Sequence, residues 1–193
     1  MSSRAEILAK VKQNKPTLVP LPNIDFNDLI TYPDLITQFI SVVEKIGGAV
    51  FLYPTEEDLA KNISLEPNET YNINTLNMSE AEKLSLSKVH SLDLERVHTA
   101  YFRGKLGVAE NGSIWLDEEA MVNRVLPIIC EHLVLVLDKN LIVPTMHHAY
   151  QNIDVSKTGY GTFLAGPSKT ADIEQSLVIG AHGPRSLKVC LIG

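Results

Sequence analysis

The segment from Gly166 to Gly193 gathers several side chains that could bind an anion or move a proton. Its sequence, GPSKTADIEQSLVIGAHGPRSLKVCLIG, includes the hydroxyls of Ser168 and Thr170, the imidazole of His182 and the guanidinium of Arg185. An arginine fork pairs bidentately with a carboxylate, which can belong to a ligand or to the protein itself. The structural alternatives are a hydroxyl cap at the start of a helix and an internal Arg–carboxylate clamp. The spacing favours these structural roles and leaves a ligand site open.

A second candidate lies in the run GVAENGSIWL, where Glu110 precedes Asn111 and Gly112. The Asn-Gly pair sits between two apolar runs, which favours a β-hairpin closed by a two-residue turn. A carboxylate held at a strand end beside exposed backbone amides could act as a general base or a nucleophile. Charged residues are also common in solvated turns, and we favour that interpretation from spacing alone.

The histidines and cysteines predict no metal site and no cofactor in this chain. His147 and His148 are adjacent, so on a helix they point about 100° apart, and the spacing His-x-x-x-His is absent. Cys130 and Cys190 each lie in an apolar run and are expected to be buried free thiols. The chain has no Cys-x-x-Cys pair, so its thiolates alone cannot ligate an iron–sulfur cluster.

Composition indicates a globular protein that does not bind polyanions in general. The chain has 193 residues, 45% of them apolar, and a net charge of 17 − 23 = −6. Such a charge argues against general attraction to nucleic acid or to anionic lipid, and a local basic pocket remains compatible with it. The first residues lack the apolar stretch of a leader, and no run approaches the roughly 20 apolar residues of a membrane span. We therefore expect a cytoplasmic protein.

The hydrophobic pattern predicts an N-terminal segment, residues 1–30, and an α/β domain, residues 31–193. The first contains a short helix and a proline-rich arm, whose residues 13–28 are a candidate partner contact. In the second, Thr31 is a candidate cap and Asp34 favours the first turn of the clearest helix. Helices are predicted over 3–12, 31–48, 54–63, 146–153 and 171–180, and strands over 49–53, 105–110, 113–116, 131–138, 160–166 and 186–192.

Alternation of these elements favours three layers, with helices on both faces of a twisted, mostly parallel sheet. The run 131–138 is almost continuously apolar and is expected to be a strand buried on both faces, and 49–53 is also expected to be buried.

The C-terminal run GPSKTADIEQSLVIGAHGPRSLKVCLIG resembles a signature of the LUD-domain family. GVAENGSIWL is similar to the AETGS-like run of that family, with Asn111 in the usual Thr position. The resemblance covers roughly residues 32–193. It implies a fold similar to the NagB/RpiA/CoA-transferase-like group. It also implies a part in the oxidation of L-lactate to pyruvate, alongside iron–sulfur partner proteins that carry the clusters.

Three functions follow as hypotheses. The first is a cluster-free subunit of a lactate-oxidising system, with one cleft lined by Glu110, Asn111, Gly112, Ser168, Thr170, His182 and Arg185. The second is an acyl- or CoA-transferring enzyme that uses Glu110 as nucleophile, because ENG is similar to the tripeptide around the catalytic glutamate of family I CoA-transferases. The third is a binding module for a carboxylated or phosphorylated metabolite. Whether the chain is an enzyme stays open between them.

Overall fold

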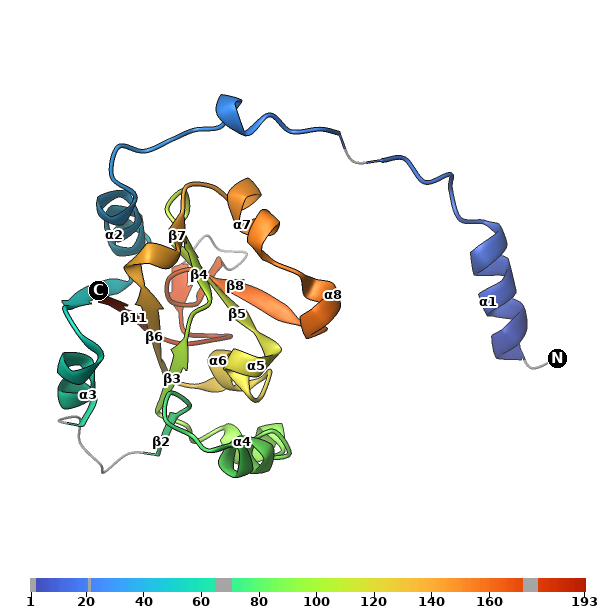
Figure 1. Cartoon of the computed structure of the whole chain (residues 1–193). Coiled ribbons are helices and arrows are strands. Elements are labelled where there is room, and N and C mark those ends of the chain that lie inside the picture. The colour runs from blue at the N-terminus through green and yellow to red at the C-terminus, as the bar shows by residue number, and fades with distance from the viewer. Residues whose placement is uncertain (1–2, 21, 65–70, 172–176) are drawn as a thin grey trace.

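The computed structural model describes residues 3–20, 22–64, 71–171 and 177–193. Its centre is a five-stranded sheet that is parallel throughout (Figure 1). The strands lie in the order β1 (Ala49–Tyr53), β11 (Ser186–Ile192), β6 (His132–Asp138), β3 (Thr99–Arg103) and β2 (Asn72–Asn74). Because all five strands run in the same direction, their amino ends share one edge of the sheet and their carboxyl ends share the other.

Strand β6 occupies the middle of the sheet and is buried on both faces, as its apolar run predicts. Leu133, Leu135 and Leu137 belong to the core on one face. Val134 and Val136 belong to the core on the other face. This division follows the alternation of side chains along a strand.

Helices cover both faces of the sheet, which confirms the predicted α/β class. On one face, α3 (Glu56–Ser64) packs Leu59 into the smaller core. The opposite face is covered by α2 (Leu35–Lys45), α4 (Glu80–Leu86), α5 (Glu118–Met121), α6 (Leu126–Ile129) and the 3-10 turn η2 (Ser91–Leu94). Helix α2 is capped by Asp34 rather than Thr31. The Asp34 carboxylate accepts hydrogen bonds from the amides of Ile36 at 2.9 Å and Thr37 at 3.3 Å.

A second, four-stranded sheet lies beyond the larger core, with the order β7 (Ile142–Val143), β4 (Leu106–Val108), β5 (Ser113–Asp117) and β8 (Gly161–Leu164). Its outer side carries α7 (Met146–Asn152) and α8 (Val155–Thr158) (Figure 1). The predicted hairpin between β4 and β5 is present. Its turn is longer than expected, because Val108 pairs with Ser113 and four residues connect them. Gly112 adopts the left-handed conformation, with φ +68°, that closes this loop.

The predicted helix over 171–180 is wrong where the structure describes it. Strand β9 (Lys169–Ala171) pairs antiparallel with β10 (Leu177–Ile179). The intervening Asp172, Ile173 and Glu174 lie outside the described residues. The run Leu-Val-Ile includes two β-branched residues, which fit a strand as well as a helix pattern, and cross-strand pairing decides between the two.

Strand β1 is also less buried than its apolar sequence predicts. It is an outermost strand of the central sheet, and Phe51 and Leu52 remain 45% and 64% exposed. Edge strands have a neighbour on one side only, which explains the difference.

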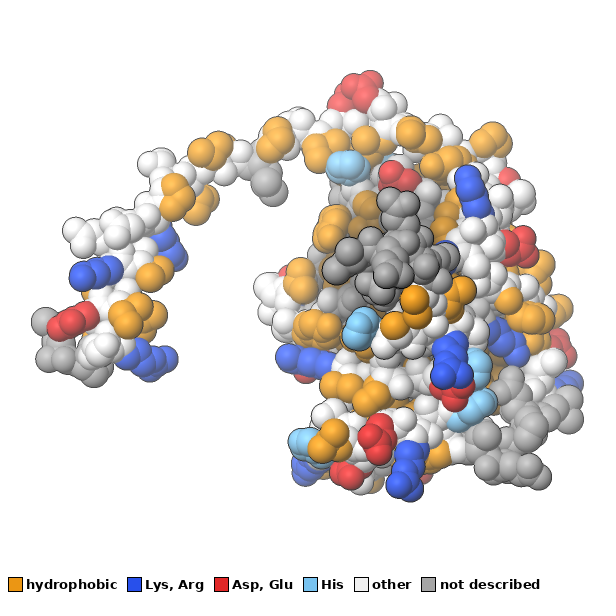
Figure 2. Space-filling view, turned by 180° about the vertical axis from the view of Figure 1, so that it is seen from behind, with side chains coloured by type: hydrophobic (Ala, Val, Ile, Leu, Met, Phe, Trp, Pro, Cys, Tyr) orange, Lys and Arg blue, Asp and Glu red, His pale blue; other side chains and the backbone are white. Residues whose placement is uncertain are grey.

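The N-terminal helix, α1 (Ser3–Gln13), forms as predicted and lies apart from the sheets at the end of an extended arm (Figure 1). Among its described residues, the arm contains one short 3-10 turn, η1 (Phe26–Asp28). Figure 2 shows apolar and basic side chains on the surface of this helix, and Ile7, Leu8 and Val11 are each more than half exposed. Among the described helices, none combines the length and the apolar character that crossing a membrane requires.

Candidate functional site

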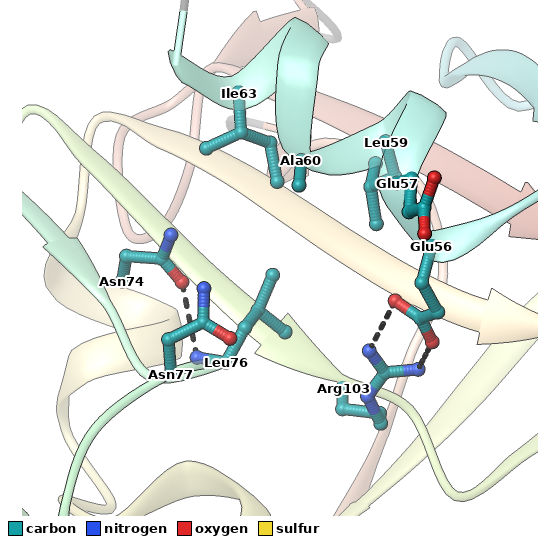
Figure 3. Close-up of a pocket in the computed structure, with 9 residues that line it drawn as sticks. All are labelled: Glu56, Glu57, Leu59, Ala60, Ile63, Asn74, Leu76, Asn77 and Arg103. Carbon is teal, nitrogen blue, oxygen red and sulfur yellow. Dashed lines mark hydrogen bonds and ion pairs between the residues drawn. The ribbon is translucent and has the colours of Figure 1, made fainter.

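Two hollows lie at opposite edges of the central sheet. The carboxyl-edge pocket is a cavity of about 470 Å³ between α3 and the ends of β2 and β3 (Figure 3). Arg103, at the end of β3, forms a bidentate pair with Glu56 of α3, with contacts of 2.7 and 3.0 Å. The apolar side chains of Leu59 and Ile63 face this cavity from the helix. Its only described guanidinium is therefore already engaged by a carboxylate of the protein.

The amino-edge pocket is a more open cavity of about 610 Å³ next to the start of β11. Arg185 immediately precedes that strand, and its Nη1 lies 2.9 Å from Oε1 of Glu131. The imidazole of His182 is exposed on the same loop. The pocket is lined by Glu95, Val125, Ile128, Ile129, Cys130, Glu131, Gly180, Ala181, His182, Gly183 and Arg185. It thus places a guanidinium, an imidazole and carboxylates around one space.

Ser168 belongs to the same part of the structure as Arg185. Its amide donates to the carbonyl of Pro184 at 2.8 Å, and its carbonyl accepts from the amide of Gly180 at 3.0 Å. Thr170 pairs with Val178 within the β9–β10 ribbon. Neither residue begins a helix among those described, so the predicted hydroxyl cap is wrong. The backbone contacts of Ser168 instead hold the loop that carries His182 and Arg185.

Glu110 lies in the loop that joins β4 and β5 of the other sheet, and it has a structural partner. Its Oε2 accepts a hydrogen bond of 3.0 Å from the amide of Met146, the first residue of α7. The N-cap residue of that helix, Thr145, makes no side-chain cap. Glu110 therefore takes over the capping of α7 from a distant part of the chain.

The other predicted hairpin residues hold this turn in shape. Asn111 Oδ1 accepts from the amide of Ser113 at 3.0 Å and from its hydroxyl at 2.7 Å. A Cβ on Gly112 would lie 3.2 Å from the amide nitrogen of Val43, so the turn packs tightly against α2. The described contacts of Glu110 and Gly112 thus include α7 and α2, and those of Ser168 and Arg185 are at the amino edge. A single cleft that unites both groups stays a prediction.

A cluster of two imidazoles and a carboxylate stands beside the amino-edge pocket. His98 precedes β3, His132 begins β6, and Glu131 lines the pocket itself. One potential ligand atom from each residue lies within 4.8 Å of the other two. We call His98, Glu131 and His132 the amino-edge histidine cluster. The sequence did not predict this cluster. Each histidine stands at or next to the start of a strand, and this is the signal that could have placed both at the same end of the sheet.

Cys130 also lines the amino-edge pocket, and its environment keeps the thiol protonated. It is 1% exposed, and burial raises the pKa of its thiol to about 12. Hydrogen bonding from backbone amides opposes this effect and is the weaker influence. A neutral buried thiol is a poor nucleophile, so Cys130 acts in packing.

Residues 93–192 match the LUD domain. The chain belongs to the LUD domain family. This confirms the resemblance that the C-terminal run and the hairpin suggested. Every residue that lines the amino-edge pocket lies within the matched range. Of the residues that line the carboxyl-edge pocket, only Arg103 lies within it. The amino-edge pocket is therefore the candidate site that this family membership favours.

Several relatives of this LUD-domain chain are named lactate utilization protein C. It is 35% identical over 83 residues to lactate utilization protein C 1 of Bacillus mycoides, a match covering 40% of this chain and 36% of that protein. It is 27% identical over 171 residues to lactate utilization protein C of Macrococcus caseolyticus, covering 84% and 70% of the two chains. The match to the Bacillus protein thus spans little more than a third of that relative's length.

A solved structure supports the architecture of this LUD-domain chain. The crystal structure of a DUF162 family protein from Deinococcus radiodurans aligns with a TM-score of 0.62 over 82% of this chain and 96% of that one. The two sequences are 20% identical. At this level of identity the likeness confirms the α/β fold class, and function has to be argued from the site.

Proposed function

We propose that this protein takes part in lactate utilization as a cluster-free component that binds a small 2-hydroxy or 2-oxo carboxylate. Two observations support the pathway: the chain belongs to the LUD domain family, and relatives that match up to 84% of it are named lactate utilization protein C. The binding role rests on Arg185, the guanidinium in the pocket lined wholly by family-matched residues.

Arg185 can hold a ligand carboxylate while it remains bound to Glu131. The described contact to Glu131 uses Nη1, and a guanidinium carries five N–H donors in a fixed fork. The side chain is 66% exposed, so an incoming carboxylate can reach the fork without breaking the core. Glu131 limits the room beside Nη1, which favours a small ligand with one carboxylate over a polyanion.

His182 supplies the second proposed contact. Its exposed imidazole lies on the same loop as Arg185 and lines the same pocket. Oxidation of lactate to pyruvate releases two electrons and two protons, one proton from the hydroxyl and one from carbon 2. On this proposal the partner proteins that take the electrons also complete the cleavage of the C–H bond. We assign His182 the role of hydrogen-bond partner to the 2-oxygen, where it can accept the hydroxyl proton.

Iron–sulfur partner proteins are proposed as the electron acceptors. The chain contains two cysteines, and both are buried and outside any disulfide. A cluster of the common type needs four cysteine thiolates, so the chain cannot supply a complete ligand set by itself. On this proposal the protein binds and positions the carboxylate, and electrons pass to clusters held elsewhere.

Calorimetric titration of L-lactate and pyruvate into Arg185→Lys and Arg103→Lys variants tests the assignment. Lysine keeps the charge and removes the fork, so we expect Arg185→Lys to weaken binding about tenfold or more. Arg103→Lys alters the carboxyl-edge pocket in the same way and should leave the affinity unchanged. The reverse pattern would move the site to the carboxyl edge, and no binding of either acid by wild type would overturn the binding role.

The pathway is tested separately in the source organism. Deletion of the gene should abolish L-lactate-dependent dye reduction in lysates, and the wild-type gene should restore it. Anaerobic purification under reducing conditions should recover iron–sulfur proteins with the tagged chain. Unchanged lactate oxidation after deletion would contradict the proposed function, whatever the calorimetry shows.

A further inference from the structure

We propose that His98, Glu131 and His132 form a binding site for a divalent transition-metal ion at the amino edge of the central sheet. The inference goes beyond the proposed function, because carboxylate binding by Arg185 requires no metal. It rests on the positions of the three side chains and on the hydrogen-bond partners of Nδ1 in the two imidazoles.

The sheet itself brings the two histidines together. Strands β3 and β6 are parallel neighbours in which Thr99 pairs with His132, and the amide of His132 donates to the carbonyl of His98 at 2.7 Å. The two rings are 4.7 Å apart between centroids and are inclined by 56°. The positions are therefore set by the backbone ladder of two central strands, which is a rigid support for a ligand set.

The three ligand atoms are close enough to converge on one ion. They lie within 4.8 Å of one another, and Nε2 of His132 is 3.9 Å from Oε1 of Glu131. Bonds of about 2.0–2.1 Å in a tetrahedral zinc site place neighbouring ligand atoms roughly 3.3 Å apart. Side-chain rotations that shorten these separations by up to about 1.5 Å would complete a tetrahedral zinc site. Such rotations need no change in the backbone, because all three side chains are only partly buried.

Each imidazole has a hydroxyl partner for its Nδ1. His98 Nδ1 lies 2.9 Å from Oγ1 of Thr99, and His132 Nδ1 lies 2.7 Å from Oγ of Ser186. In the tautomer in which Nδ1 donates to these oxygens, Nε2 of each ring carries a lone pair that can bind an ion. Metal-binding histidines use this arrangement, with one nitrogen on the ion and the other held by a hydrogen-bond acceptor.

The donor set selects the class of metal. Two imidazoles and one carboxylate suit Zn²⁺, Fe²⁺ or Co²⁺, whereas Ca²⁺ and Mg²⁺ favour oxygen ligands. Three protein ligands also leave at least one coordination position for water or another small molecule. Glu131 belongs to both the cluster and the amino-edge pocket, so that position is adjacent to the pocket.

Arg185 provides an internal test of the site. Its guanidinium binds Oε1 of Glu131 and places a positive charge next to the proposed ion. Removal of this charge should strengthen metal binding, whereas loss of either imidazole should weaken it. A nonspecific surface interaction with histidine would not show opposite responses of this kind.

Titration of tag-free, metal-stripped protein with Zn²⁺ against a chromophoric chelator measures the affinity. We expect about one Zn²⁺ per chain, with affinity at least tenfold lower in His98→Gln/His132→Gln and higher in Arg185→Gln. The control is His147→Gln, which removes an exposed imidazole of α7 and should leave the affinity unchanged. Co²⁺ should give visible absorption bands in wild type that the double variant lacks.

Glu131→Gln is a second route to the same answer should the double variant fail to fold, because it is isosteric and partly exposed. It should also lower the affinity for Zn²⁺. Failure of wild type to bind Zn²⁺ and Co²⁺, or equal binding by the folded His98→Gln/His132→Gln and wild-type proteins, would overturn the proposal. No lactate is present in these titrations, so they are independent of the proposed function.

Discussion

Arg185 is bound to Glu131 twice, once through its side chain and once through its backbone. Its Nη1 lies 2.9 Å from Oε1 of Glu131, and its amide donates to the carbonyl of Glu131 at 2.8 Å. The two residues are 54 positions apart and adjoin the amino ends of the neighbouring strands β11 and β6. Strand pairing therefore places the family-like C-terminal run against the amino-edge histidine cluster.

Arg185→Ala should change the free energy of unfolding by less than about 1 kcal/mol, because ion pairs between exposed side chains contribute little. Its side chain is 66% exposed and that of Glu131 is 40% exposed, and the backbone hydrogen bond remains in the variant. Urea denaturation followed by circular dichroism measures the difference. Destabilisation beyond about 2 kcal/mol would assign Arg185 a structural role and would weaken any functional conclusion drawn from its variants.

Leu135→Ala should lower the free energy of unfolding much more than Arg185→Ala does. Leu135 is fully buried in the middle of β6, and truncation of a buried leucine typically costs about 2–5 kcal/mol. Leu84→Ala is the matched control, since Leu84 is 57% exposed on α4 and should change stability by no more than about 0.5 kcal/mol. Equal effects in urea denaturation would contradict the placement of β6 at the centre of the core.

Strands β1, β6 and β11 of the central sheet and the clearest helix could be predicted because their patterns are local, whereas β3 is not among the predicted strands. The run HLVLVLD is apolar at every interior position, and its structure β6 is buried on both faces. Helix α2 has apolar residues at helical spacing, and Phe39 and Val43 are fully buried. The hairpin of β4 and β5 follows from a turn signal between two apolar runs, although the turn itself is two residues longer.

Features that depend on strand order could not be predicted. The sequence 171–180 fits either a helix or a strand, and the pairing of β10 with β9 decides it. The low burial of β1 follows from its position as an outermost strand of the sheet, which an apolar run does not reveal. The amino-edge histidine cluster unites residues whose strands become neighbours only in the folded sheet. For the same reason the partner of Glu110 could not be foreseen, since Met146 lies 36 residues away.

Glu110 should not form a covalent acyl intermediate. Its carboxylate accepts a hydrogen bond from the first amide of α7, a structural role that ties up one of its two oxygens. After incubation with a panel of acyl-CoA thioesters and hydroxylamine, mass spectrometry of the tryptic peptides should show unmodified Glu110. The matched variant Glu110→Gln should give the same spectra apart from the substitution. A hydroxamate on Glu110 in wild type alone would support the transferase hypothesis instead.

Both cysteines should resist alkylation in the native protein. Cys130 and Cys190 are each 1% exposed and form no disulfide, and burial raises the pKa of the Cys130 thiol to about 12. Iodoacetamide at pH 8 should therefore label neither residue until urea unfolds the chain, after which two labels per molecule should appear by mass spectrometry. Rapid labelling of Cys130 without denaturant would contradict this, because it would show that reagent reaches the thiol through the amino-edge pocket of the folded protein.

Asp34→Asn should remove a pH-dependent part of the stability. Hydrogen bonds from the Thr37 hydroxyl and then from the amides of Thr37 and Ile36 hold the pKa of the Asp34 carboxyl below its usual range. A lowered folded-state pKa stabilises the protein above the unfolded value, about 3.9, and this stabilisation is lost as pH falls through the folded value. Asparagine still caps the helix without a charge. Wild type should thus be more stable than Asp34→Asn in urea denaturation at pH 7, with a difference that shrinks at acidic pH. A difference that is constant with pH would contradict this ionic contribution.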